Sequence, residues 1–363
     1  MKLVKKYILK SFIKPFAGGL AAFLFIMTVA HFFDFLHTFL KYKPPLEILI
    51  KYFLFRMPAW FTTITPIATL IAVLISLGSL EKNNEITAVK TSGIKLIRVI
   101  IPLFILSVFI SMGSGIINET IVPHSEPAAN ILFERIKEKA PLKPDETRRD
   151  IIYMGESSTL YFIDHFKKNT LTGLRIIEFY PGTALEKKLI VAEKAHYLGS
   201  NSWDLVNGSI RTFNNNISDP LTGYEDFNRR QISLAEVPAD FSKPHKEPEQ
   251  MSLPALADYI RKLKQSGMST RRERVLFHYK IAFPFASAII LVLGIPLALY
   301  KKIDSLTISF FFAIIISFLY WGGISVGRSM GINGILPPVL AAWSANIIFF
   351  LVGMVMMIKT RII

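Results

Sequence analysis

The stretch IAFPFASAIILVLGIPLALY occupies residues 281–300 and carries no charged side chain. A helix of about 20 apolar residues crosses the roughly 30 Å of hydrocarbon in a bilayer, so this stretch predicts a membrane span. Similar length and composition recur in five other segments, which are residues 15–36, 57–80, 99–118, 305–327 and 336–358. Three predicted spans therefore precede a long central region, and three follow it.

The composition agrees with a membrane protein. Hydrophobic residues make up 51% of the chain and charged residues only 19%. Lys and Arg outnumber Asp and Glu by 13 to 4 in residues 1–117 (+9) and by 12 to 3 in residues 256–363 (+9), whereas residues 118–255 hold 17 against 20 (−3). We attribute the excess positive charge of the first and last segments to membrane orientation and anionic lipid rather than to nucleic-acid binding. The chain has no cysteine, which excludes disulfides and thiolate metal sites.

The basic flanks of the spans predict the orientation, because cytoplasmic loops are enriched in Lys and Arg. One side of the predicted bundle holds the N-terminal lysines, residues 81–98, Lys301, Lys302, Lys359 and Arg361. Both termini are then cytoplasmic, and residues 119–280 lie outside. Basic residues between 261 and 280 oppose this orientation, but the rule is weak beside a long translocated domain. The first span is too long for a cleaved signal peptide, so we expect a retained anchor.

The central region has short β-prone runs separated by turn residues, and it predicts an inserted sandwich or jelly-roll-like sheet. Within it, Asn207-Gly208 separates two strand-like runs and predicts a hairpin turn. Residues 238–254 contain four prolines and predict a linker. Residues 253–264 place apolar side chains at helical spacing beside basic ones, which favours a helix on the membrane surface. The expected fold is an α+β membrane protein with domains at 1–118, 119–255 and 256–363.

Four motifs are similar to those of one transporter family. In residues 80–93 (LEKNNEITAVKTSG), Glu85 is followed eight residues later by Gly93, and the other motifs are KIAFPF at 280–285, LGIPL at 293–297 and LPPVLAAW at 336–343. With the 3+3 arrangement around a β-rich insert, the whole chain resembles the LptF/LptG permeases of the lipopolysaccharide export ABC transporter. The family often continues the last motif with Pro-Asn, whereas this chain has Ala345-Asn346. The Pro-Pro and Ala-Ala-Trp motif favours LptG over LptF.

The resemblance implies a function and a set of partners. The chain would be a permease subunit in the bacterial inner membrane that pairs with a paralogous LptF/LptG subunit and passes lipopolysaccharide to a periplasmic bridge. Its expected partners are an LptB-like ATPase dimer in the cytosol and LptC-like and LptA-like jelly-roll proteins in the periplasm. No Gly-Lys-Ser or Gly-Lys-Thr occurs in the sequence, so we expect no cofactor on this chain and ATP hydrolysis by the partner.

The residues of the predicted inner loop favour a short helix on physical grounds alone. Asn83 or Asn84 can cap a short helix at about residues 81–96, Glu85 would lie in its first turn, and Gly93 would end it. By resemblance this is the coupling helix, with Glu81, Glu85 and Gly93 as the residues that couple to the ATPase. An ordinary hairpin at the lipid surface is the alternative.

Ionisable residues near the end of the first span are candidates for lipid binding. His31, Asp34 and His37 occur at steps of three residues, so the outer two diverge by about 120° around a helix and metal binding is disfavoured. Groups of this kind usually face protein or water. By resemblance, His31 falls where relatives carry a basic residue that contacts lipid phosphates. Snorkelling to the interface is the alternative.

Lys41, Lys43 and Arg328 are predicted at the outer mouth of the first and fifth spans, where they would attract phosphates and acidic sugars. Solvated interfacial charge is the alternative for each of them. Two other classes compete with the permease interpretation. They are an ABC permease of the lipoprotein-release or mechanotransmission type, and a membrane lipid-modifying enzyme, although no catalytic set stands out. A secondary transporter is disfavoured, because charges are nearly absent from the spans.

Overall fold

The computed structural model describes residues 2–138, 147–155, 159–180, 183, 185–214, 221–242, 247–300, 306–360 and 362. The chain forms two compact units. The helical unit comprises Met1–Lys139 and Arg274–Ile363, and the sheet unit comprises Ala140–Glu273. Lys301, Lys302 and Arg361, which contributed to the predicted orientation, lie outside the described residues.

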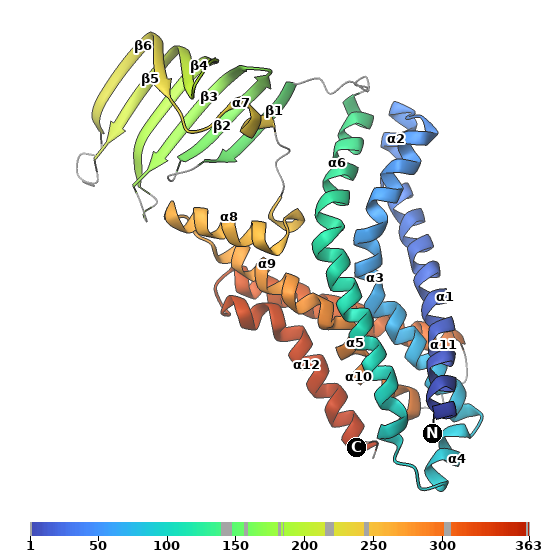
Figure 1. Ribbon diagram of the computed structural model, residues 1–363. Coiled ribbons are helices and arrows are strands. Elements are labelled where there is room, and N and C mark those ends of the chain that lie inside the picture. Colours follow the sequence, from blue (N-terminus) through green and yellow to red (C-terminus); the bar gives the residue numbers. More distant parts are fainter. Residues whose placement is uncertain are drawn as a thin grey trace. The chain divides into compact units, whose positions relative to one another are not determined.

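The helical unit is built from long apolar helices (Figure 1). They are α1 (Lys2–Asp34), α2 (Leu36–Tyr42), α3 (Leu46–Lys82), α4 (Glu85–Thr91), α5 (Leu96–Thr120), α6 (Val122–Glu138), α9 (Arg271–Ala282), α10 (Ala286–Tyr300), α11 (Leu306–Ile332) and α12 (Pro338–Lys359). Six described segments are long and apolar enough to cross a bilayer: Lys6–Asp34, Leu46–Lys82, Leu96–Thr120, Arg271–Leu299, Thr307–Ile332 and Pro338–Lys359. The predicted six spans are confirmed.

The core of the helical unit lies along α3 and α10. About 78% of the apolar window of α3 is buried, against 6% for that of α1, so α1 presents most of its apolar surface outward. Helices α3 and α10 approach each other closely at Gly294 of α10. A Cβ at this position would lie 2.5 Å from Val73 Cγ1 and 2.9 Å from Leu70 Cδ1 of α3. Helix α3 also packs between α1 and α6 (Figure 1).

The span containing α9 and α10 is interrupted by the short 3₁₀ turn Phe283–Phe285. Pro284 supplies no N–H, and the Ala286 N–H bonds to the carbonyl of Phe283, which leaves the Ala282 carbonyl without its helical partner. Asn346 Nδ2 of α12 donates to this carbonyl at 2.7 Å, and Tyr320 of α11 donates to Asn346 Oδ1 at 2.5 Å. A buried polar network therefore joins three spans at the helix break.

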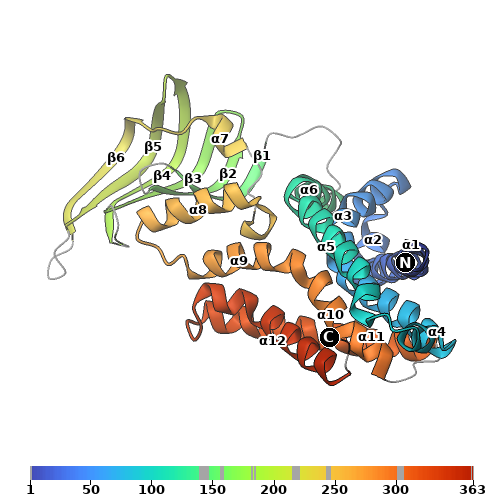
Figure 2. The ribbon, with the colours of Figure 1, turned by 60° about the horizontal axis from the view of Figure 1, so that its bottom comes forward.

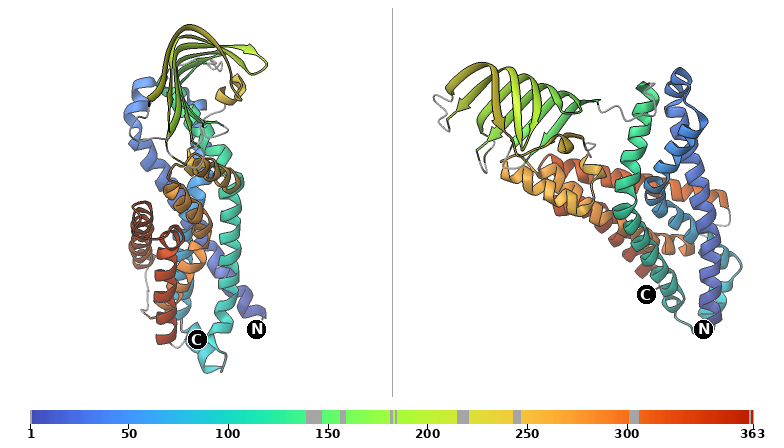
Figure 3. Two further views of the ribbon diagram at one scale, coloured as in Figure 1. Left: turned by 90° about the vertical axis from the view of Figure 1, so that its left-hand side faces the viewer. Right: turned by 45° about the horizontal axis from the view of Figure 1, so that its top comes forward.

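The sheet unit contains one antiparallel sheet of six strands in sequential order. The strands are β1 (Thr147–Met154), β2 (Thr159–Lys167), β3 (Thr170–Phe179), β4 (Glu186–Gly199), β5 (Ser202–Phe213) and β6 (Leu221–Ser233). The α+β class and the inserted sheet are confirmed. The strand order is simpler than in a jelly roll, because each strand pairs with its neighbour in sequence and the strands curve as one layer (Figure 3).

The predicted hairpin at Asn207-Gly208 is wrong, because β5 runs through both residues. Asn207 has a φ of 50°, and a Cβ on Gly208 would lie 2.1 Å from the carbonyl oxygen of Val191. The strand therefore continues in register through a residue of positive φ at the point where β4 approaches closely. A residue with positive φ also occurs inside β3, at Gly173. Asn-Gly favours positive φ within a strand as it does in a turn, so the motif alone does not distinguish them.

Three short elements follow the sheet: α7 (Pro238–Ser242), a 3₁₀ turn (Pro248–Gln250) and α8 (Leu253–Gln265). Figure 2 shows α7 beside β1, and its Phe241 is fully buried against Tyr161 and Trp203, with ring centroids 5.5 and 6.0 Å away. Helix α8 buries Leu256 and Leu263 of its apolar face. Its placement on a membrane surface remains a prediction.

Candidate coupling helix and lipid-binding cluster

Helix α4 lies in the hairpin between α3 and α5. It is shorter than the predicted 81–96, because Glu81 still belongs to α3 and α5 begins at Leu96. Asn84 occupies the N-cap position with a φ of 58° but makes no side-chain cap bond, so the expected Asn cap does not form. Gly93 has a φ of 76° and its N–H bonds to the Lys90 carbonyl, as expected for a glycine that ends a helix.

One side of α4 is anchored and the other is open. Ile86 is 2% exposed and belongs to the main core of the helical unit, and Val89 packs against that core. Thr87, Ala88, Lys90 and Thr91 are exposed. Burial of Ile86 fixes the helix to the ends of two spans, so its exposed side is presented on a rigid support.

Two carboxylates lie at the beginning of this hairpin. Glu85 is partly buried, and its Oε1 accepts a 3.2 Å hydrogen bond from the Tyr7 hydroxyl of α1. Glu81 Oε2 is buried and makes no hydrogen bond within the described residues. A carboxylate in such a place binds a guanidinium or ammonium group strongly. Sequence reasoning identified both glutamates but missed Tyr7, since nothing local links residue 7 to residue 85.

The six predicted lipid-binding residues fall into two places. His31 is half-buried and turned toward α3, where its Nε2 lies 2.6 Å from the Tyr52 hydroxyl and its ring packs edge-on against Trp60 at 5.1 Å. Beyond it, Asp34 ends α1, and the four other candidates of this segment, Asp34, His37, Lys41 and Lys43, are all exposed. Five candidates therefore share the α1–α2 segment.

Arg328 is held elsewhere. It lies on α11 with its guanidinium carbon 5.0 Å from the centre of the Tyr279 ring of α9. This contact holds Arg328 against α9, the first helix of the interrupted span.

Arg56 lies near the His31–Tyr52 pair and is a charged residue that sequence reasoning missed. Its guanidinium donates to Glu126 at 3.2 Å and to Asn130 at 2.7 Å, and it lies 5.8 Å from the centre of the Tyr52 ring. Glu126 and Asn130 are one turn apart on α6, and Tyr52 and Arg56 are one turn apart on α3. The equal one-turn spacing of the two pairs was the signal that the sequence offered for this contact. Only the packing of α6 on α3 shows that the two pairs meet.

The comparisons with known proteins agree with this architecture. Comparison with curated proteins gives no significant match. A sequence model of the family described as lipopolysaccharide export system permease LptF/LptG matches residues 6–359, which include both groups of spans, α4 and the inserted sheet. The chain belongs to the LptF/LptG family of lipopolysaccharide export system permeases.

Proposed function

We propose that this chain is the permease subunit of an ABC transporter that extracts lipopolysaccharide from the bacterial inner membrane. In this proposal it pairs with a second, similar permease, and two cytosolic ATPase subunits supply the work. The observation that carries it is α4, a short helix between two spans with one side buried by Ile86 and the other side exposed.

The ATPase would contact the exposed side of α4 through a basic residue near Glu85. The Tyr7 hydrogen bond orients the Glu85 carboxylate and connects α4 to α1, and α4 also contacts α3 and α5 directly. A displacement of α4 would therefore reach three helices at once. Glu81, whose buried Oε2 has no hydrogen-bond partner among the described residues, would provide a second acceptor.

Lipid would enter beside α1 and α11. Exposed Lys41 and Lys43 supply positive charge for phosphate groups, and the outward apolar surface of α1 supplies a wall for acyl chains. His31 would act through Tyr52 and the aromatic rings around it rather than as a free cation. Asp34 and His37 would border this entrance beside α1, and Arg328 would border it beside α11.

The sheet would receive the lipid and continue a bridge of similar β proteins in the periplasm. Strand β6 pairs with β5 on one side, and most of its side chains are exposed. Such an edge suits addition of a partner strand. The positive charge of Arg229 on β6 is already balanced, because Arg229 donates a 2.8 Å hydrogen bond to Asp204 of β5. This bond lowers the pKa of the Asp204 carboxyl group. We prefer LptG over LptF as the narrower assignment.

Charge reversal at α4 tests this function. Glu85→Lys should reduce ATP-driven release of lipopolysaccharide from proteoliposomes by at least about tenfold, because a like charge would face the basic residue of the ATPase. Glu47→Lys is the matched control, since Glu47 is also a glutamate in the first turn of a helix but lies at the far end of α3. Undiminished ATP-driven release by Glu85→Lys would contradict the coupling role.

A further inference from the structure

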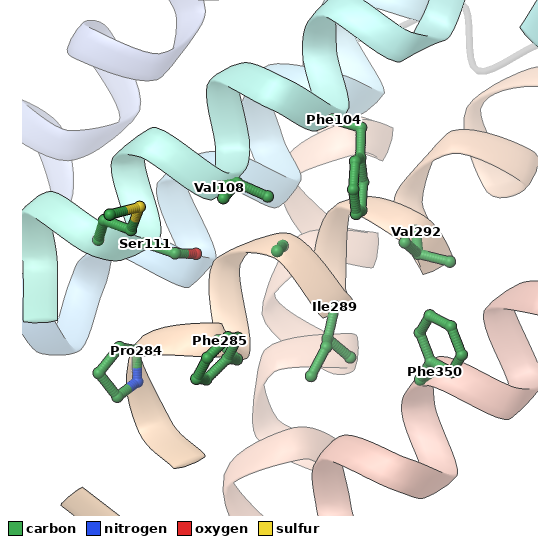
Figure 4. Close-up of a pocket in the computed structure, with 10 residues that line it drawn as sticks. Phe104, Val108, Ser111, Pro284, Phe285, Ile289, Val292 and Phe350 are labelled. Carbon is green, nitrogen blue, oxygen red and sulfur yellow. The ribbon is translucent and has the colours of Figure 1, made fainter. Parts of the chain in front are cut away.

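The helical unit contains an apolar slot between α5, α10 and α12, with a volume of about 310 Å³ (Figure 4). Phe104, Val108 and Phe350 help to line it, and apolar groups alone do not select one occupant. The sheet unit offers a more selective surface, because α8 and the first turn of α9 gather positive charge. Residues 253–272 carry five basic side chains and one acidic side chain.

Helix α8 is held within the protein by its apolar side and by its C-terminal end. Leu256 is fully buried, and Leu263 is 6% exposed. The Ser266 hydroxyl donates to Met154 Sδ of β1 at 3.8 Å, and a Cβ on Gly267 would lie 2.0 Å from the backbone carbonyl carbon of Thr183. The apolar side of α8 is therefore occupied by the protein itself, and its polar and basic side is the one that faces outward.

The first turn of α9 is held near α8. Arg272 in this turn forms a 3.2 Å ion pair with Glu249, which lies in the 3₁₀ turn just before α8. Burial, and then the charge of Glu273, raise the pKa of the Tyr259 hydroxyl of α8 above its usual value. A charge acts on a titrating group in this way only at short range, so Glu273 lies close to α8. The cations of the two helices therefore lie in one region of the sheet unit.

Most of these cations have no carboxylate partner. Besides the pair between Arg272 and Glu249, Arg261 is paired with Asp258 at 2.6 Å. Lys262, Lys264 and Arg271 form no ion pair with any residue that the structure describes. Lys264 and Arg271 are exposed, and Lys262 is half-buried. These three residues form the basic surface, and its charge favours an anionic partner.

The position of the basic surface along the chain favours a bilayer as that partner. Arg271 is the first residue of the segment Arg271–Leu299, which is long and apolar enough to cross a membrane. Its uninterrupted apolar run begins at Ile281, ten residues later, or about 15 Å of helix. Lipid headgroups lie just outside this boundary, where long basic side chains reach them. Helix α8 ends at Gln265, six residues before the same segment.

Membrane orientation does not account for these cations. In the predicted orientation they lie on the side of the bilayer where Lys and Arg are normally scarce beside a span. A basic surface next to a membrane attracts anionic headgroups, and the attraction fades within about one Debye length. The partner that fits both the charge and the position is therefore an anionic phospholipid.

We propose that the basic surface of Lys262, Lys264 and Arg271 binds the phosphate headgroups of anionic phospholipids in the surrounding bilayer. The attraction is electrostatic, because the apolar side of α8 is already buried. Binding would hold α8 at the membrane surface. This surface goes beyond the proposed transport route and does not depend on it.

Energy transfer to labelled lipids tests the proposal. The chain has no cysteine, so Ala257→Cys gives a single site for a donor dye on the exposed side of α8, one turn before Arg261. The labelled full chain is placed in phosphatidylcholine vesicles with a trace of lipid that carries an acceptor dye on its acyl chain. The acceptor lipid is either phosphatidylglycerol or phosphatidylcholine, so only the headgroup differs.

We expect about twofold more transfer to phosphatidylglycerol than to phosphatidylcholine at low salt. The preference should disappear in about 1 M KCl, where the Debye length is about 3 Å. Equal transfer to the two lipids at low salt would overturn the proposal.

Charge reversal locates the preference. Lys264→Glu should lower it, and Lys264→Glu combined with Arg271→Glu should abolish it. Lys264→Arg combined with Arg271→Lys keeps both charges and should keep the preference. Lys167→Glu is the matched control, because Lys167 is an exposed lysine at the end of β2 opposite to the Met154–Leu160 pair. A preference that survives the double reversal, or that Lys167→Glu removes equally, would show that these cations do not form the binding surface.

Discussion

The helical unit and the sheet unit bury polar groups in different ways. In the helical unit several buried hydroxyls bond to their own helix, as Thr65 does to the Phe61 carbonyl and Thr69 to the Thr65 carbonyl. In the sheet unit the polar tips of large aromatic side chains reach another segment: Trp203 Nε1 donates to the Glu236 carbonyl at 3.0 Å, and Tyr161 donates to the Glu236 carboxylate. These hydroxyl groups are thus satisfied within one helix, whereas the aromatic side chains of the sheet unit depend on a distant segment, so single substitutions should affect the two kinds of group unequally.

The largest expected effect is in the sheet unit. Trp203→Ala removes a fully buried side chain and its bond to Glu236, and should destabilise this unit by about 3–5 kcal/mol. Limited proteolysis of the full chain should show faster cleavage in residues 147–242 and unchanged cleavage in the helical unit. Equal acceleration in both units would contradict their separation.

A smaller effect is expected at the Asn346 network, which joins three spans. Asn346→Leu leaves the Ala282 carbonyl and the Tyr320 hydroxyl without this partner, at a cost of about 1–2 kcal/mol. Thermal unfolding in detergent measures the change. Tyr320→Phe removes only one of the two bonds and should cost less. If both variants cost the same, the bond to Ala282 contributes nothing.

The positive φ of Asn207 inside β5 gives the next test. Asn207→Val places a β-branched residue at positive φ and should cost about 1 kcal/mol of stability in the sheet unit. Asn207→Gly is the control, because glycine accepts this conformation and should stay within a few tenths of a kcal/mol of wild type. Chemical denaturation followed by proteolysis of the sheet unit compares them. A valine variant as stable as the glycine variant would contradict the positive φ at residue 207.

The smallest effect concerns alkaline pH. Burial, and then the bond to Glu236, raise the pKa of the Tyr161 hydroxyl above its usual value. The folded state keeps this proton where the unfolded phenol, with a pKa of about 10, loses it, so stability falls as pH rises above about 10. Tyr161→Phe should flatten this decline in a denaturation series. A decline as steep as that of wild type would exclude Tyr161 as its source.

Most of the helical unit was predictable, because a run of apolar residues long enough for a bilayer has few alternatives. The continuous strand through Asn207-Gly208 was not predictable, since alternation on either side of Asn-Gly has the same appearance in a hairpin and in one long strand. Gly93 was identified by its position after a short helix, and its positive φ confirms that role. The His31–Tyr52 and Arg56–Glu126 contacts join residues far apart in sequence, so only helix packing reveals them.

The central claim is that α4 connects this permease to an ATPase. Affinity purification of the native full chain from membranes, followed by mass spectrometry and an ATPase assay, tests it most directly. We predict a nucleotide-hydrolysing partner that copurifies with wild type and with Glu47→Lys, and that is lost or strongly reduced with Glu85→Lys. Recovery of the chain with no ATPase, or with equal amounts in all three preparations, would contradict the account.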